Sequence, residues 1–139
     1  MGWYSIMPPL KVQKESDTAI GQMYFDIFGN DWDYFAITHM STSDGMGIEL
    51  FSFLNGKKEA PNFNPFKTGL FHFCVQDPDI ENLRKKIVDY DGKQRMPIRA
   101  HYPNEKPYKI VYVQDPFGIV FEIYTHRYEL TYPSVVYQK

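Results

Sequence analysis

The chain has 139 residues, which is enough for one domain with a hydrophobic core of its own. Aromatic residues make up 17% of it, and because aromatic side chains favour strands, the composition predicts a sheet-rich fold. The net charge is −2 and no basic stripe stands out, which argues against nucleic acid as a partner. The single cysteine, Cys74, excludes an intrachain disulfide and suits a reducing compartment.

The N-terminal ten residues lack the charged segment and the long apolar run of a signal peptide. No stretch of the sequence approaches the roughly 20 apolar residues that a membrane span needs. We therefore expect a cytoplasmic protein that does not enter a membrane.

Apolar spacing and turn residues define the elements of the first half. Ile20, Met23, Tyr24 and Ile27 recur at helical spacing, and the Asp44-Gly45 pair is typical of a hairpin turn. The predicted elements are a strand over 3–7, a loop over 11–17, a helix over 18–28, strands over 34–40 and 47–54 joined by a turn over 41–45, and a loop over 55–65.

The second half contains one clear amphipathic helix among strands. Asp77-Pro78 is a helix start and Asp91-Gly92 a helix end, and between them an apolar stripe comprises Ile80, Leu83, Ile87 and Tyr90. Around this helix the sequence predicts strands over 68–76, 94–100, 109–114 and 119–126, a loop over 102–107, a turn over 115–118, and an aromatic, β-prone tail over 127–139.

The two halves share a short, weak repeat. In each half a turn containing glycine precedes an apolar strand that holds a glutamate, an aliphatic residue and an aromatic residue in succession. The two copies are Glu49-Leu50-Phe51 and Glu122-Ile123-Tyr124. A glutamate inside an apolar strand is costly unless it is paired or binds a metal ion.

Each of three predicted strands contains, among apolar neighbours, one residue of a kind that commonly binds metal ions. Alternation puts Glu49 on a face with Phe51 and Phe53, Glu122 with Tyr124 and His126, and His72 with Leu70 and Cys74. Two carboxylates and an imidazole suit a divalent ion such as Zn, Mn, Fe, Co or Ni, with a position left open for substrate.

Each of these residues also has a simpler interpretation. Glu49 can face solvent on a half-exposed sheet, His72 can be a hydrogen-bonded core or surface histidine, and Glu122 can pair with Lys109 on a neighbouring strand. For His39, His101 and His126 an exposed or turn position is the better interpretation, and for Cys74 that of a small buried hydrophobic residue.

At these segments the chain resembles the vicinal-oxygen-chelate superfamily, which includes glyoxalase I, bleomycin-resistance proteins and extradiol dioxygenases. Residues 68–78 (TGLFHFCVQDP) resemble the entry to the second module of that family, and residues 115–123 (DPFGIVFEI) resemble its exit. Residues 47–51 (GIELF) resemble the last strand of the first module.

The resemblance implies an α+β fold of paired βαβββ modules that form a cupped mixed sheet. It implies one domain over 1–139, with a partial first module over 1–55, a second module over 66–126 and a tail over 127–139. Residues Glu49, His72 and Glu122 would be the metal ligands, with Glu122 favoured over Glu49 as the catalytic base. Aromatic residues of the substrate cleft would be Phe51, Phe53 and Tyr124.

One departure from the family pattern concerns the start of the chain. The family's first strand, with its ligand, and the following helix have no counterpart before Gly2, so we expect an N-terminally incomplete first module. That leaves an unpaired sheet edge, which predicts a homodimer or partial cover by residues 132–137 of the tail.

The expected function is that of a metal-dependent lyase or isomerase of the glyoxalase type, similar to lactoylglutathione lyase, acting on a small molecule with adjacent oxygens. Two alternatives stay open at this point. One is a metal-free small-molecule binding protein of the bleomycin-resistance type, and the other is an inactive, truncated chain.

Overall fold

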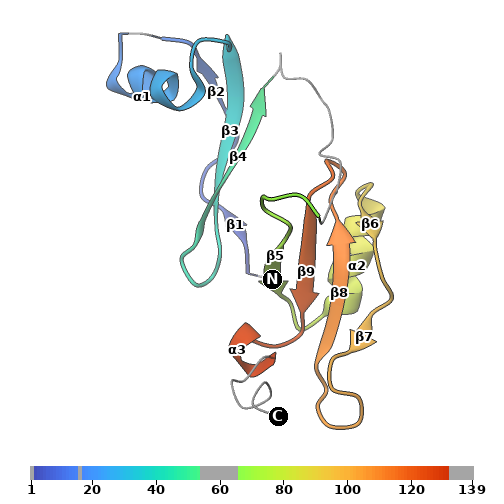
Figure 1. The fold of residues 1–139 in the computed structure, drawn as a ribbon. Helices are drawn as coiled ribbons and strands as arrows, with labels where there is room; N and C mark the ends of the chain where they lie inside the picture. Colours follow the sequence, from blue (N-terminus) through green and yellow to red (C-terminus); the bar gives the residue numbers. More distant parts are fainter. Residues whose placement is uncertain (1, 16, 54–65, 132–139) are drawn as a thin grey trace. The chain divides into compact units, whose positions relative to one another are not determined.

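A computed structural model describes residues 2–15, 17–53 and 66–131 (Figure 1). The chain divides into two compact units, a first-half unit over residues 2–58 and a second-half unit over residues 59–139, and each has its own sheet. None of the helices within the described residues combines the length and the hydrophobicity needed to cross a bilayer.

The sheet of the first-half unit is antiparallel and is built around β3 (Tyr34–Ser41). Strand β4 (Gly47–Phe53) forms a hairpin with β3 and pairs with it over residues 35–41. The other edge of β3 is shared by β1 (Tyr4–Ser5) and β2 (Leu10–Gln13). In Figure 1, β2 and β4 accordingly lie on either side of β3.

Helix α1 (Ala19–Phe28) covers one face of this sheet with aromatic side chains. It begins at Thr18, whose side chain accepts a hydrogen bond from the Gly21 amide, and it ends at Gly29, which has a φ of 69°. The ring of Tyr24 lies 4.9 Å from that of Phe35, which is fully buried. The core of the unit contains Tyr24, Trp32, Phe35 and Ile37, with Val12, Phe28, Phe51 and Phe53 packed against it.

The sheet of the second-half unit is mixed. Strand β5 (Phe73–Gln76) pairs in parallel with β9 (Val120–Tyr124), and β9 pairs antiparallel with β8 (Lys109–Gln114). The far edge of β8 is covered by two short strands, β6 (Lys93–Gln94) and β7 (Arg99–Ala100).

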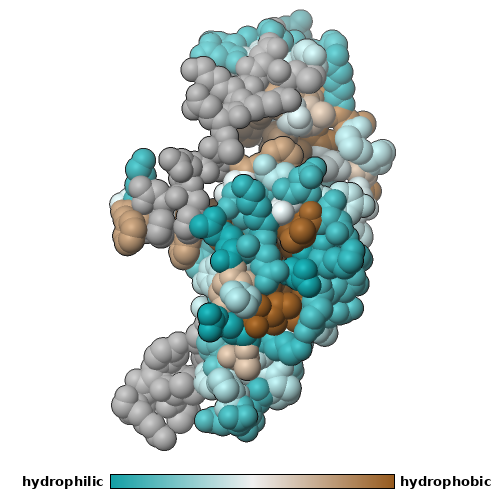
Figure 2. Space-filling view, turned by 90° about the vertical axis from the view of Figure 1, so that its right-hand side faces the viewer, coloured by the Kyte–Doolittle hydropathy of each residue, from teal (hydrophilic) through white to brown (hydrophobic). Residues whose placement is uncertain are grey.

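Helix α2 (Ile80–Asp89) connects β5 to β6 and packs against β8. Its first residue, Ile80, is fully buried, as are Val111 and Ile123, which are directly opposed in the β8–β9 ladder. The surface over α2, β6 and β7 is mainly hydrophilic, with hydrophobic side chains confined to small patches (Figure 2). A short helix, α3 (Tyr128–Thr131), follows β9.

Two predictions for the first half need correction, and a third cannot be compared with the structure. The loop predicted over 11–17 is wrong at its start, because β2 spans Leu10–Gln13 and sets Leu10 opposite Ile37. The strand predicted over 3–7 is reduced to Tyr4–Ser5, next to Pro8-Pro9, since proline cannot donate to a ladder. The loop predicted over 55–65 lies outside the described residues.

In the second half, the strand predicted over 68–76 begins only at Phe73. Its parallel partner β9 begins at Val120, which the register places opposite His72, so residues 68–71 have no strand to pair with. In addition, Gly69 has a φ of 145°, outside the strand region. The strand predicted over 94–100 is divided into β6 and β7, and the division contains Pro97.

The helix boundaries and the tail also differ from the sequence prediction. The N-cap of α2 is Asp79, while the side chain of Asp77 accepts a hydrogen bond from the Asp79 amide instead. Tyr90 is 78% exposed and therefore does not belong to the buried stripe of the helix. Residues 128–131 are helical rather than extended, and residues 132–139 of the tail lie outside the described residues.

Candidate metal centre

The register of three strands gathers polar side chains on one face of the second-half sheet. Cys74 on β5 is the direct ladder partner of Glu122 on β9, and Tyr112 on β8 is the partner of Glu122 on its other side. His72 stands two residues before Cys74, just outside the strand. Directly opposed residues point to the same face, so one row of the ladder presents a thiol, a carboxylate and a phenol together.

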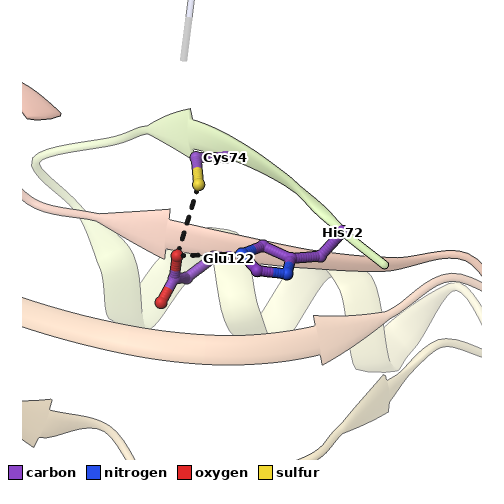
Figure 3. A group of neighbouring side chains, drawn as sticks. All are labelled: His72, Cys74 and Glu122. Atoms are coloured by element: carbon purple, nitrogen blue, oxygen red, sulfur yellow. Dashed lines mark hydrogen bonds and ion pairs between the residues drawn. The ribbon is translucent and has the colours of Figure 1, made fainter. Parts of the chain in front are cut away.

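These side chains converge on one carboxylate oxygen. Tyr124 donates a hydrogen bond from its hydroxyl to Oε2 of Glu122 at 2.6 Å, and the thiol of Cys74 donates to the same oxygen at 3.2 Å. The Nε2 atom of His72 lies 3.5 Å from that oxygen. Figure 3 shows Cys74 and His72 approaching Glu122 from different directions.

Glu122 is almost completely buried, with 3% of its surface exposed. A buried carboxylate costs free energy unless donors or an ion compensate its charge, and its surroundings supply both a phenol and a thiol. The alternative in which Glu122 pairs with Lys109 is wrong, because the Lys109 Nζ lies 2.5 Å from Oε1 of Glu81 on α2.

Cys74 is a hydrogen-bond donor at neutral pH. Partial burial of the thiol raises its pKa to about 12, and the hydrogen bond to Glu122 and the charge of that carboxylate raise it in the same direction. The residue as a whole is exposed, although its thiol turns towards Glu122. The expectation of a small buried hydrophobic residue at this position is therefore wrong.

The imidazole of His72 is held between aromatic rings. Its ring centroid lies 4.4 Å from that of Phe71 and 5.2 Å from that of Tyr112, whose hydroxyl is 3.5 Å from Nε2. The Nδ1 atom is buried and has no hydrogen-bond partner among the described residues. Nε2 is thus the ring nitrogen that faces Glu122.

The spacing of the donor atoms of His72 and Glu122 fits a single metal ion. One atom each from His72, Cys74 and Glu122 lies within 4.8 Å of the other two. Two ligand atoms at about 2.0–2.1 Å from a tetrahedral ion lie roughly 3.3 Å apart. The separation of 3.5 Å between His72 and Glu122 is close to that value, and their nitrogen and oxygen donors suit a divalent transition metal.

Glu49 occupies the corresponding register position in the first-half unit. The β3–β4 hairpin pairs Ser41 with Gly47 and the β8–β9 hairpin pairs Gln114 with Val120, so Glu49 and Glu122 are each two residues into the second strand. The Oε1 atom of Glu49 lies 3.4 Å from Nδ1 of His39, its ladder partner on β3. His39 is half-exposed, and it pairs with this carboxylate rather than pointing only to solvent.

Phe51 and Phe53 contribute to the core of the first-half unit. Their rings lie 5.3 and 5.1 Å from that of Phe28 on α1, and both side chains are partly buried. Because Glu49 belongs to this unit as well, its joining His72 and Glu122 as a ligand stays a prediction, as do the cleft roles of Phe51, Phe53 and Tyr124.

Two residues of the site escaped the sequence interpretation. Cys74 carries a signal, since it stands two residues after His72 on the same predicted face, but a lone cysteine favours a packing role. Tyr112 carries no local signal, because its position opposite Glu122 depends on the β8–β9 register.

Comparison with known proteins gives one family. The sequence model of the Glyoxalase/Bleomycin resistance protein/Dioxygenase superfamily matches residues 10–123. No curated protein gives a significant match to the sequence.

Solved structures give the same fold. A glyoxalase family protein from Bacillus cereus superposes with a TM-score of 0.62 at 18% identity, covering 88% of this chain and 77% of that one. A glyoxylase/bleomycin resistance protein/dioxygenase domain from Frankia sp. EAN1pec gives a TM-score of 0.51 at 18% identity, covering 90% and 79%. These similarities confirm the predicted α+β fold class.

Proposed function

Because the chain belongs to the glyoxalase/bleomycin resistance protein/dioxygenase superfamily, we propose that it is a metal-dependent lyase or isomerase of the glyoxalase type. Its substrate would be a small molecule with two adjacent oxygens. The observation that carries this proposal is the convergence of His72, Cys74 and Glu122, whose ligand atoms lie within 4.8 Å of one another on one sheet face.

His72 and Glu122 would hold the ion, which we expect to be Zn, Ni, Co, Mn or Fe. When bound, such an ion supplies Lewis-acid polarisation of the substrate oxygens. Glu122 would accept the proton from the carbon next to those oxygens, and its hydrogen bond from Tyr124 fixes the orientation of the carboxylate. Glu49 is proposed as a further ligand because it repeats the register position of Glu122.

A calorimetric titration of the full chain with Zn, Co, Ni and Mn tests the metal site. We expect binding of about one ion per chain, with at least about a tenfold loss of affinity in His72→Ala. The variant His101→Ala is a matched control. His101 packs against Tyr102 and does not belong to the group formed by His72, Cys74 and Glu122. Equal affinity in His72→Ala and His101→Ala would exclude His72 as a ligand.

Activity is tested on adducts of 2-oxoaldehydes with thiols and on related substrates with adjacent oxygens. Turnover by the metal-loaded protein that disappears in Glu122→Gln supports the proposed role of Glu122 as base. Turnover that persists in this variant assigns the proton transfer to another group.

The metal-free binding protein is the second candidate. It is favoured by the hydrogen bonds from Tyr124 and Cys74, which compensate the buried charge of Glu122 without an ion. Under this alternative a small ligand raises the melting temperature of the chelator-treated protein, since any ligand that binds only the folded state stabilises it.

We also propose that the protein is a cytoplasmic homodimer. Within the described residues β4 pairs only with β3, and an open strand edge favours association with a second chain. Sedimentation equilibrium tests the dimer, and a monomer at all concentrations studied would exclude it.

A further inference from the structure

The β5–β9 ladder fixes where the Cys74 side chain points. The neighbours of Cys74 in the strand, Phe73 and Val75, face the opposite side of the sheet. There the ring of Phe73 stacks on that of Phe121 at 5.3 Å, and Val75 is buried. Turning Cys74 away from Glu122 would shift the whole strand by one residue and move the buried Val75 to the other face of the sheet.

The thiol is as close to the carboxylate as a shared ion requires. The Sγ atom of Cys74 lies 3.2 Å from Oε2 of Glu122. For ligand bonds of about 2.3 Å to sulfur and 2.0 Å to oxygen, a tetrahedral ion places the two atoms roughly 3.5 Å apart. A movement of a few tenths of an ångström is therefore sufficient for both atoms to coordinate one ion.

The second-half unit supplies three different donor types at this place. His72 offers a borderline imidazole nitrogen, Glu122 a hard oxygen and Cys74 a soft sulfur. A site with only nitrogen and oxygen donors accepts manganese readily, whereas a sulfur donor favours zinc and cobalt over manganese and magnesium.

We infer that Cys74 is a third metal ligand, so that His72, Cys74 and Glu122 form a mixed nitrogen, sulfur and oxygen site selective for zinc-like ions. This inference rests on the metal site of the proposed function. On coordination the S–H bond of Cys74 breaks, its electron pair forms the bond to the ion, and the proton passes to solvent. The hydrogen bond from the thiol to Glu122 is lost in the same step.

Cobalt(II) is the probe for this inference, because thiolate bound to cobalt gives an intense charge-transfer band in the near ultraviolet. Cys74 is the only cysteine in the sequence, so any such band belongs to it. The full chain is titrated with cobalt(II) and, separately, with manganese(II). The variants are Cys74→Ser and Cys74→Ala, with near-ultraviolet circular dichroism to establish that they fold.

We expect the wild-type chain to develop the charge-transfer band in proportion to bound cobalt. Folded Cys74→Ser and Cys74→Ala are expected to lose the band and at least about tenfold in cobalt affinity, with a much smaller change for manganese. Cobalt binding without the band, at equal affinity in all three proteins, overturns the inference and leaves the proposed metal site intact. Failure of the wild-type chain to bind cobalt overturns both.

Discussion

Replacing Tyr124 with phenylalanine removes a buried hydrogen bond and keeps the aromatic ring. The Tyr124 hydroxyl donates to Oε2 of Glu122 at 2.6 Å, and the two residues are 4% and 3% exposed. A hydrogen bond to a charged group contributes about 1.5–3 kcal/mol, because the carboxylate left behind loses a donor that water cannot replace. We expect Tyr124→Phe to lower the free energy of unfolding by this amount at neutral pH.

The measurement is urea unfolding of the metal-free chain, followed by circular dichroism. Tyr90→Phe is the matched control, since Tyr90 lies in the same unit and is 78% exposed, and it should change the free energy of unfolding by less than about 0.5 kcal/mol. If Tyr124→Phe is as stable as the wild-type chain, the Tyr124 hydroxyl does not compensate the buried charge of Glu122.

Two further predictions concern stability away from the site. Alanine normally stabilises a helix relative to glycine, but a Cβ at Gly21 would lie 1.7 Å from the carbonyl oxygen of Glu15, so Gly21→Ala should destabilise the chain by at least about 1 kcal/mol in urea unfolding. A gain in stability would show that this close approach is absent. The hydrogen bond from Lys109 lowers the pKa of Glu81, so this pair stabilises the folded state above the ordinary carboxyl pKa and the effect is lost as the pH falls through the lowered value. Glu81→Gln should therefore cost up to about 1 kcal/mol at neutral pH and nothing in acid, and a difference from wild type that grows in acid would contradict the pairing.

The elements with strong local signals could be predicted from the sequence. Helix α1 follows its apolar spacing and its Gly29 stop, and the β3–β4 hairpin follows the Asp44-Gly45 turn, where Gly45 has the expected positive φ of 91°. In these segments the residues that determine the conformation are neighbours in sequence, so no knowledge of partners is needed.

The segments that depend on distant partners were the ones predicted wrongly. Strand β2 is polar at alternate positions and becomes a strand because Leu10 and Val12 pair with β3. The start of β5 at Phe73 is set by the start of β9, which lies almost fifty residues later in the chain. Pairing of this kind is not encoded in any short window of sequence.

The same distinction between local signals and distant partners applies to the residues of the candidate site. Glu122 and His72 could be singled out from the sequence because a charged or polar residue in an apolar segment is costly and therefore conspicuous. The convergence of Cys74 and Tyr124 on the same oxygen follows from the parallel β5–β9 register and from the side-chain geometry, neither of which the sequence displays.

The proposed metal site of the second-half unit holds a divalent ion through His72 and Glu122. Its most direct test is elemental analysis of the purified full chain after incubation with zinc and removal of unbound metal, with His72→Ala and Glu122→Gln treated in the same way. We predict about one ion per wild-type chain and almost none in either variant. Retention of zinc by both variants, or its absence from the wild-type chain, would exclude a metal site formed by His72 and Glu122.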